Sequence, residues 1–336
     1  MRRVADVLRA AGVEVALEPT RSRGSGGDQA RAAIHAGCDA VFACGGDGTV
    51  FDVLQGVAET NAALGVIPLG TGNVLAHDLG VADNPERAAA KLLSFLPQSI
   101  SLGRIQSAGR TRFFTVAAGV GVHAELIYRA SAQAKQRGGF LAYYQHGARL
   151  LFRHQFVPFP VEIITTEGKL IQTTSLELVA MRVRSFGGPL RHWRPGSSLL
   201  SPDLRLMLLH NAKRAHLLRY ALQALTGLAP YQDLDPDSHD RGISFISAKS
   251  VICHAPEISG AHTDALRVQA DGEILGPVPT GISIIPHALN LLLPPTAEWN
   301  RELPDLPIAP CDFEPQSCKK FWPPSEGRQV RLAVSG

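Results

Sequence analysis

The sequence predicts an α/β domain with a parallel sheet, followed by a domain built from β-strands. Three observations carry this prediction. Over the first hundred residues, helical and strand periodicities alternate, which is typical of a parallel sheet covered by helices. Two of the predicted strands end directly in glycine-rich turns, and from about residue 99 the hydrophobic period changes to two. A chain of 336 residues is long enough for two domains of ordinary size.

The elements of the first domain follow from the spacing of its apolar residues. Helices are predicted where apolar residues recur every three or four positions, and strands where short apolar runs are bounded by turn residues. Pro85 lies where a helix can begin, because the first helical residue needs no N–H donor. The predicted order is helix 4–11, strand 13–17, helix 27–36, strand 39–43, helix 50–59, strand 64–67, helix 73–79 and helix 86–95.

The second domain is predicted to be a β-sandwich, because its strands are short and alternate in polarity. Two helical segments, 125–152 and 213–228, interrupt these strands. From residue 295 the chain is rich in proline and has no sustained periodicity, so a disordered tail is expected. The predicted domains are therefore 1–100 and 101–294, with the tail at 295–336. The predicted strands are 100–105, 112–118, 159–165, 175–182, 204–209, 250–253, 265–270 and 280–285.

The chain opens inside a helix, with no strand before Val4. A parallel α/β sheet normally begins with a strand that feeds its first helix, so the sheet is expected to lack its opening strand. Two explanations stay open: a sequence that starts late, at an internal methionine, or an impaired protein. The first is favoured because the charged residues of the predicted site are retained.

Composition and charge exclude several classes of protein. The 33 Lys and Arg residues nearly balance the 30 Asp and Glu residues, so no global positive field favours a nucleic-acid partner. No apolar run is long enough for a membrane span, and the first residues lack the apolar block of a secretory signal, which favours the cytoplasm. The 5 cysteines form no C-x-x-C pair, which argues against a disulfide framework or a zinc site.

The first glycine turn is the pentad Gly45, Gly46, Asp47, Gly48 and Thr49, which follows a buried apolar run. Glycine amides that turn toward an anion at a helix start can hold phosphate oxygens. Asp47 can hold Mg²⁺ through water, and Thr49 can donate a hydrogen bond to phosphate. The pentad therefore predicts a nucleotide-phosphate site.

A second glycine turn, Pro68 to Asn73, repeats this logic one strand later. Gly70 and Gly72 allow close approach to a ligand, while Thr71 and Asn73 offer side-chain hydrogen bonds. Because the carboxyl ends of parallel strands meet at one edge of a sheet, the two turns are expected to face the same crevice.

The motifs together resemble the catalytic domain of the diacylglycerol kinase family, in particular the bacterial soluble lipid kinases that are similar to sphingosine and ceramide kinases. The resemblance covers about residues 1–294, and the order of the motifs agrees throughout. The pentad is shared with NAD kinases and 6-phosphofructokinases, so the second turn and the late Asp-Gly-Glu give the specificity. The matching segments are Gly45–Thr49, Pro68–Asn73, Ala118–Gly121, Gly187–Pro189, Gly196–Leu200, Asp203–Leu209 and Gln269–Glu273.

The resemblance implies transfer of the γ-phosphoryl group of ATP to a lipid hydroxyl, with Mg²⁺ as the metal. Asp271 matches the catalytic carboxylate of the family, and Glu273, two residues on, could assist through metal or water. Thr20 matches a threonine near the nucleotide. Read without the family, Asp271 and Gly272 could equally form an ordinary hairpin turn.

Three positions depart from the family pattern. Asp52 replaces a glutamate that commonly follows the pentad, Val74 replaces an aspartate after the second turn, and His123 stands where an aspartate is common. The loop that contains Arg21 and Arg23 could contact phosphates, or it could be a solvated flexible loop.

Other functions stay open at this point. A soluble-substrate kinase, such as an NAD kinase, shares the pentad, and a catalytically impaired nucleotide- or lipid-binding module fits the missing strand. Segments 140–159 and 213–228 combine apolar and basic residues and suit transient contact with an anionic membrane face, although packing on the sandwich explains them as well. An unpaired sheet edge would favour a homodimer.

Overall fold

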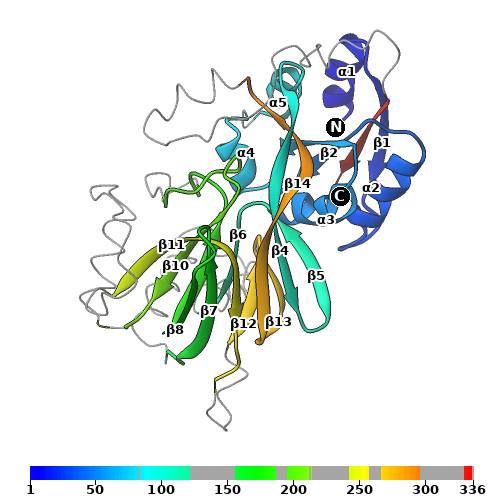
Figure 1. The fold of residues 1–336 in the computed structure, drawn as a ribbon. Coiled ribbons are helices and arrows are strands. Elements are labelled where there is room, and N and C mark those ends of the chain that lie inside the picture. Colours follow the sequence, from blue (N-terminus) through cyan, green and yellow to red (C-terminus); the bar gives the residue numbers. More distant parts are fainter. Residues whose placement is uncertain are drawn as a thin grey trace.

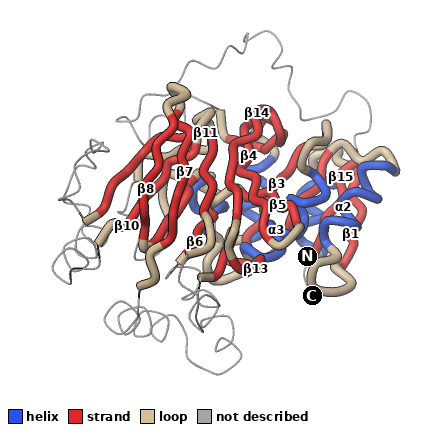
Figure 2. Tube along the Cα trace, turned by 60° about the horizontal axis from the view of Figure 1, so that its bottom comes forward, coloured by secondary structure: helices blue, strands red, loops and turns tan. Residues whose placement is uncertain are grey.

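The structure is a computed structural model that describes residues 1–81, 84–121, 156–186, 195–211, 213, 242–256, 266–295 and 329–334. Within these ranges the strands join into one 15-stranded sheet (Figure 1). Helices lie at one end of the molecule and long strands extend from it (Figure 2). Among the described helices, none combines the length and hydropathy required to cross a bilayer. The predicted α/β class with a strand-rich second half is confirmed.

The first half contains a parallel sheet with the strand order β1-β15-β2-β3. Every residue of β2 and β3 is buried, which explains why their sequences read as continuous apolar runs rather than as alternating ones. Asn84 caps the last helix by accepting a hydrogen bond from Arg87 N at 2.9 Å, and Pro85 is its first residue. The elements are α1 (Arg2–Ala10), β1 (Glu14–Pro19), α2 (Gly26–His35), β2 (Ala40–Gly45), α3 (Asp47–Val57), β3 (Ala63–Pro68), α4 (Val74–Asp78) and α5 (Pro85–Leu92).

The strand β15 (Gln329–Val334) comes from the far end of the chain and lies between β1 and β2, parallel to both (red arrow in Figure 1). It pairs over six residues with β1 and over five with β2. The first element is the helix α1, as expected, and β15 occupies a place in the sheet that the sequence left without a strand. The expectation of a disordered tail is wrong for residues 329–334. The physical reason is that the facing edges of β1 and β2 carry backbone groups that need hydrogen-bond partners when buried. Residues 296–328 of the predicted tail lie outside the described residues.

The second half is antiparallel, as the period of two predicts. It contains the hairpins β4–β5, β7–β8 and β12–β13, which are joined by pairs of strands distant in the chain, such as β4–β14, β7–β11 and β6–β12. The strands are β4 (Leu96–Ser107), β5 (Arg110–Phe114), β6 (Ala117–Val120), β7 (Phe159–Thr165), β8 (Leu170–Ser175), β9 (Glu177–Met181), β10 (Leu204–Leu209), β11 (Ile243–Cys253), β12 (Arg267–Ala270), β13 (Glu273–Pro277) and β14 (Thr280–Leu293).

Two long strands join the halves. The strand β4 starts in the first half and runs antiparallel to β14, which also pairs with β3 through Asn290 and Leu291. Alternate residues of β9 face different cores: Leu178 and Ala180 pack in the core of the second half, while Val179 and Met181 pack in that of the first. The relative position of the two halves is therefore fixed by continuous strands and by a shared layer.

Several sequence predictions differ from the structure in detail. The predicted strand 112–118 is two strands, β5 and β6, separated by Thr115 and Val116, and β8 and β13 were missed. The predicted helix 125–152 lies outside the described residues, as does the predicted helix 213–228 apart from Lys213, and so does His123. Among the described cysteines, Cys38, Cys44 and Cys253 are buried free thiols.

Candidate active site

The two glycine turns pack against each other, backbone on backbone, at the carboxyl ends of β2 and β3. A Cβ on Gly70 would lie 2.6 Å from Gly46 Cα, and a Cβ on Gly72 would lie 2.6 Å from Asp47 Oδ2. The backbone of Gly46 leaves no room for a side chain at position 70, so glycine is required there for the close approach, whereas a side chain at position 72 would have to displace the carboxylate of Asp47. The turns therefore meet, as their position at neighbouring strand ends predicts.

Hydrogen bonds hold the second turn in place. Gly70 N donates to Asn73 Oδ1 at 3.0 Å, and Asn73 Nδ2 donates to Gly70 O at 2.7 Å. Asn73 has a left-handed backbone with φ of 48°, which asparagine tolerates better than most residues. The side chain of Asn73 therefore closes the turn, which is a structural task in addition to its predicted contact with nucleotide.

Asp47 connects the two turns. Its Oδ1 accepts a hydrogen bond from Val74 N at 2.8 Å, the first helical residue after the second turn. Burial raises the pKa of Asp47, while the N–H groups of Val74 and Asn73 and the nearby His77 oppose this rise. The backbone of Val74 thus contributes a contact even though its side chain lacks the polar group common in the family.

A pocket of about 460 Å³ lies beside the second turn. Its lining residues are Pro68, Leu69, Gly70, Thr71, Asn73, His77 and Pro85. Predicted nucleotide-binding residues thus border a measurable depression in the surface.

Asp271 lies in the turn between β12 and β13, with φ of 45°, and its carboxylate is saturated with donors. Oδ2 accepts from Thr115 N at 2.8 Å and from Thr115 Oγ1 at 3.1 Å. Oδ1 accepts from Val116 N at 2.8 Å and from Ala117 N at 2.9 Å. Burial raises the pKa of Asp271 to about 6, against the effect of these donors. Asp271 therefore closes the gap between β5 and β6.

Glu273 reaches the first glycine turn from the second half of the molecule. Its Oε1 lies 3.4 Å from the position that a Cβ on Gly48 would take, at the start of α3. Its Oε2 forms an ion pair with Arg23 Nη2 at 2.5 Å. Of the two carboxylates predicted to be catalytic, Glu273 is therefore the one for which the structure gives a contact with the pentad.

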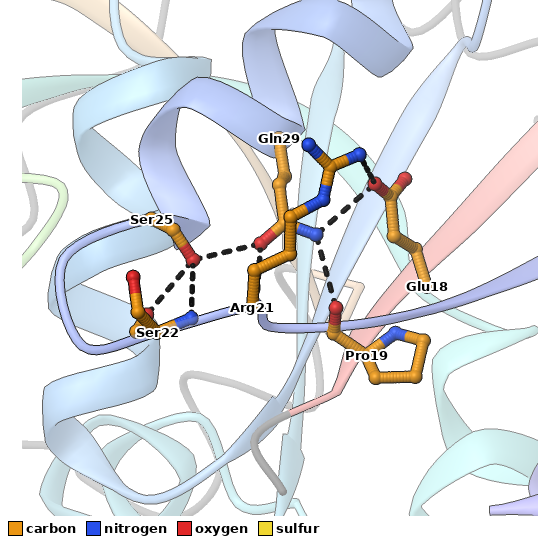
Figure 3. A network of polar contacts seen from close by, with 6 residues as sticks. All are labelled: Glu18, Pro19, Arg21, Ser22, Ser25 and Gln29. Atoms are coloured by element: carbon orange, nitrogen blue, oxygen red, sulfur yellow. Dashed lines mark hydrogen bonds and ion pairs between the residues drawn. The ribbon is translucent and has the colours of Figure 1, made fainter.

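The loop after β1 is ordered by hydrogen bonds, and Figure 3 shows Gln29 at the centre of the network. Gln29 Oε1 accepts from Arg21 N at 3.1 Å and from Ser25 Oγ at 2.9 Å. Gln29 Nε2 donates to Glu18 Oε1 and Pro19 O, each at 3.0 Å. The flexible-loop interpretation is thus not favoured. Thr20, predicted near the nucleotide, is a half-buried residue at the start of this loop.

Asp52 also holds this loop, because its Oδ2 accepts a hydrogen bond from Gly24 N at 2.8 Å. The shorter carboxylate that departs from the family pattern is therefore engaged with the loop backbone.

The sequence interpretation missed Gln29 and the Thr115–Ala117 donors. The importance of Gln29 could have been inferred from the sequence. It lies on the same helix face as Gly26, Ala30 and Ala33, and a polar residue on a buried face is expected to have hydrogen-bond partners.

A buried ion pair connects α4 with the segment after β9. Arg184 Nε lies 3.4 Å from Asp78 Oδ1, which also accepts from Arg184 N at 3.0 Å and Ser185 N at 3.2 Å. Burial raises the pKa of Asp78 to about 6 despite this neighbouring positive charge. The second glycine turn leads directly into α4, so this pair ties the turn to the other half.

Comparison with known proteins defines the class. A sequence profile described as the diacylglycerol kinase catalytic domain matches residues 1–105. A diacylglycerol kinase of Mycobacterium tuberculosis is 32% identical over 265 residues, which is 78% of this chain and 79% of the relative. A diacylglycerol kinase of Bacillus subtilis is 29% identical over 287 residues, which is 84% of this chain and 87% of the relative. These matches identify a kinase, that is, a phosphotransferase.

The chain belongs to the diacylglycerol kinase family. The fold agrees with this assignment, since a solved structure named as a diacylglycerol kinase of Bacillus anthracis superposes with a TM-score of 0.63. That alignment covers 88% of this chain and 91% of the other at 20% identity.

Proposed function

We propose that this protein transfers the γ-phosphoryl group of ATP to the hydroxyl of diacylglycerol or a similar lipid, with Mg²⁺ as the metal. The observation that carries the proposal is the contact between the two glycine turns, with Glu273 of the second half placed against the first turn. The names of the M. tuberculosis and B. subtilis relatives support a lipid alcohol as the acceptor.

The site fits a nucleotide and its metal in chemical terms. The positive end of the dipole of α3, an 11-residue helix that begins at Asp47, attracts phosphate oxygens. Within the described ranges, no group of three or more Asp, Glu, His or Cys side chains is placed to hold an ion. This suits Mg²⁺, which keeps most of its water and binds through one or two carboxylates and the substrate phosphates. Asp47 is the proposed protein contact, and the metal would neutralise phosphate charge.

The two late carboxylates are proposed to have different tasks. Glu273 is free on the side of the pentad apart from its ion pair with Arg23, so it can approach the reacting groups. Asp271 stays a predicted general base, and a pKa raised to about 6 suits that role. To accept a proton, Asp271 must first lose one of its four hydrogen-bond donors, because these donors occupy the carboxylate lone pairs that would take the proton.

The test is transfer of radiolabel from ATP to diacylglycerol presented in mixed micelles. Glu273→Gln and Asp47→Asn are expected to lower turnover by about 100-fold or more, since electrostatic and proton-transfer effects of this size are usual. Glu167→Gln is the matched control, because Glu167 is an exposed carboxylate in the turn between β7 and β8. Label appearing in NAD rather than in lipid, or in no acceptor, would contradict the proposal.

Contact with a membrane surface and formation of a homodimer stay proposals. The basic amphipathic segments that motivate membrane contact lie almost wholly outside the described residues.

A further inference from the structure

The ion pair between Arg23 and Glu273 is placed where bound phosphate would compete for it. The two side chains meet at 2.5 Å, and Arg23 is 77% exposed while Glu273 is 30% exposed. The other oxygen of Glu273 lies against Gly48 in the pentad. The guanidinium of Arg23 is therefore held beside the first glycine turn by a carboxylate from the opposite half of the molecule.

The backbone on both sides of Arg23 is pinned. Ser22 N donates to Ser25 Oγ at 3.1 Å, and Gly24 N donates to Asp52 Oδ2 at 2.8 Å. Arg21 N is held by the buried Gln29 (Figure 3). Because an exposed ion pair contributes little to stability, the order of this loop is explained by its hydrogen bonds and not by the ion pair between Arg23 and Glu273. These hydrogen bonds fix the backbone position from which the Arg23 side chain extends.

The charges around the turns require a cation when a polyanion binds. Asp47 and Glu273 both lie at the pentad, and a triphosphate would add further negative charge there. Arginine suits this task, because its planar guanidinium can donate two parallel hydrogen bonds to phosphate oxygens. A phosphate with two negative charges competes well with one carboxylate for the same donor.

We propose that Arg23 is a phosphate-positioning residue whose guanidinium leaves Glu273 and pairs with the terminal phosphate when ATP binds. The exchange would keep Arg23 paired in both states and would free Glu273 at the moment when the phosphate to be transferred is in place. This inference rests on the proposed function, since it needs ATP at the two glycine turns.

The test compares a non-hydrolysable ATP analogue with ADP by titration calorimetry. Arg23→Gln is expected to weaken binding of the analogue by about tenfold, the effect of one charge-assisted hydrogen bond, and to change ADP binding by less than about twofold. Arg23→Lys keeps the charge and is expected to recover part of the loss.

Arg21→Gln is the matched control, because it removes the same charge from the same loop. The guanidinium of Arg21 lies 3.7 Å from Glu18 (Figure 3), so the affinities for both nucleotides are expected to stay as in the wild type. A purely structural role for Arg23 would weaken both nucleotides equally, and that result would overturn the inference. An equal effect of Arg21→Gln would overturn it as well.

A second measurement tests the exchange itself. Without metal, Glu273→Gln is expected to tighten binding of the ATP analogue, because Arg23 no longer has a competing carboxylate. The same change in the Arg23→Gln background is expected to have no such effect. Weaker binding in the single variant would contradict the exchange. If the wild-type protein showed no measurable affinity for the ATP analogue, the proposed function would be contradicted, and this inference would fall with it.

Discussion

The two halves of the molecule obtain their backbone partners in different ways. The parallel half places β15 between β1 and β2, although more than 280 residues separate β2 from β15 along the chain. The antiparallel half combines hairpins between consecutive strands, such as β12–β13 around Asp271, with pairs of strands distant in the chain, such as β4–β14 and β6–β12. Non-local pairing must overcome a larger loop-closure entropy than local pairing. The place of β1 in the sheet in particular depends on the distant strand β15.

The site combines both kinds of assembly. The glycine turns depend on the neighbouring positions of β2 and β3, which the parallel sheet sets. Glu273 depends on a hairpin turn whose Asp271 is bonded to the gap between β5 and β6. Damage to either half is thus expected to impair the same site through different causes.

The largest expected effect is from Leu332→Pro in β15. Leu332 is paired with Leu17 of β1 and Phe42 of β2, and proline removes the N–H donor from this central strand. We expect a loss of roughly 3–5 kcal/mol in the free energy of unfolding. Hydrogen exchange should show lost protection in β1 and β2. Leu332→Ala keeps the donor and serves as control; unchanged protection in the proline variant would mean that β15 does not complete the sheet.

Gly70→Ala is expected to come next, at about 2–3 kcal/mol, because the new Cβ would lie 2.6 Å from the backbone of Gly46. The turns would be forced apart, so the affinity for nucleotide should fall along with stability. Gly281→Ala is a matched control, since no atom lies within 4 Å of its Cβ position. Urea denaturation and calorimetry give both quantities. Similar behaviour of the two variants would rule out the close contact of the turns.

Asp271→Asn is expected to cost about 2 kcal/mol, because the amide NH₂ would face backbone N–H groups in place of a lone pair. In the same denaturation experiment, Glu273→Gln should change stability by less than about 0.5 kcal/mol, as it loses only an exposed ion pair. Full stability of Asp271→Asn with lost turnover would instead favour a purely catalytic role for this carboxylate.

The smallest effect is a pH dependence from Asp78. Its pKa is raised to about 6 in the folded protein, above the value of about 3.9 in an unfolded chain, so the folded state binds more protons between these values. The free energy of unfolding should therefore fall as pH rises from about 4 to about 6. In Asp78→Asn, this decrease in the free energy of unfolding should be smaller by about 1–2 kcal/mol than in the wild type, as measured from urea midpoints across that pH range. Parallel profiles for variant and wild type would contradict the raised pKa.

Local patterns were enough to predict the helices of the first half, its strands other than β15, and the place of both glycine turns. Continuous apolar runs at β2 and β3 indicated burial, and the pentad indicated the start of α3 within a few residues. The break between β5 and β6 was not predictable in the same way. Its cause is Asp271, whose hydrogen bonds to Thr115–Ala117 join segments more than 150 residues apart.

The sequence by itself determined the α/β class, the two glycine turns and the Asp-Gly-Glu turn, because each depends on residues close together in the chain. Only the tertiary structure decided which strand lies between β1 and β2, and that Arg23 meets Glu273 beside Gly48. The reason is physical: periodicity and turn chemistry report local backbone preference, whereas the choice among distant partners depends on which buried backbone groups and charges remain to be paired.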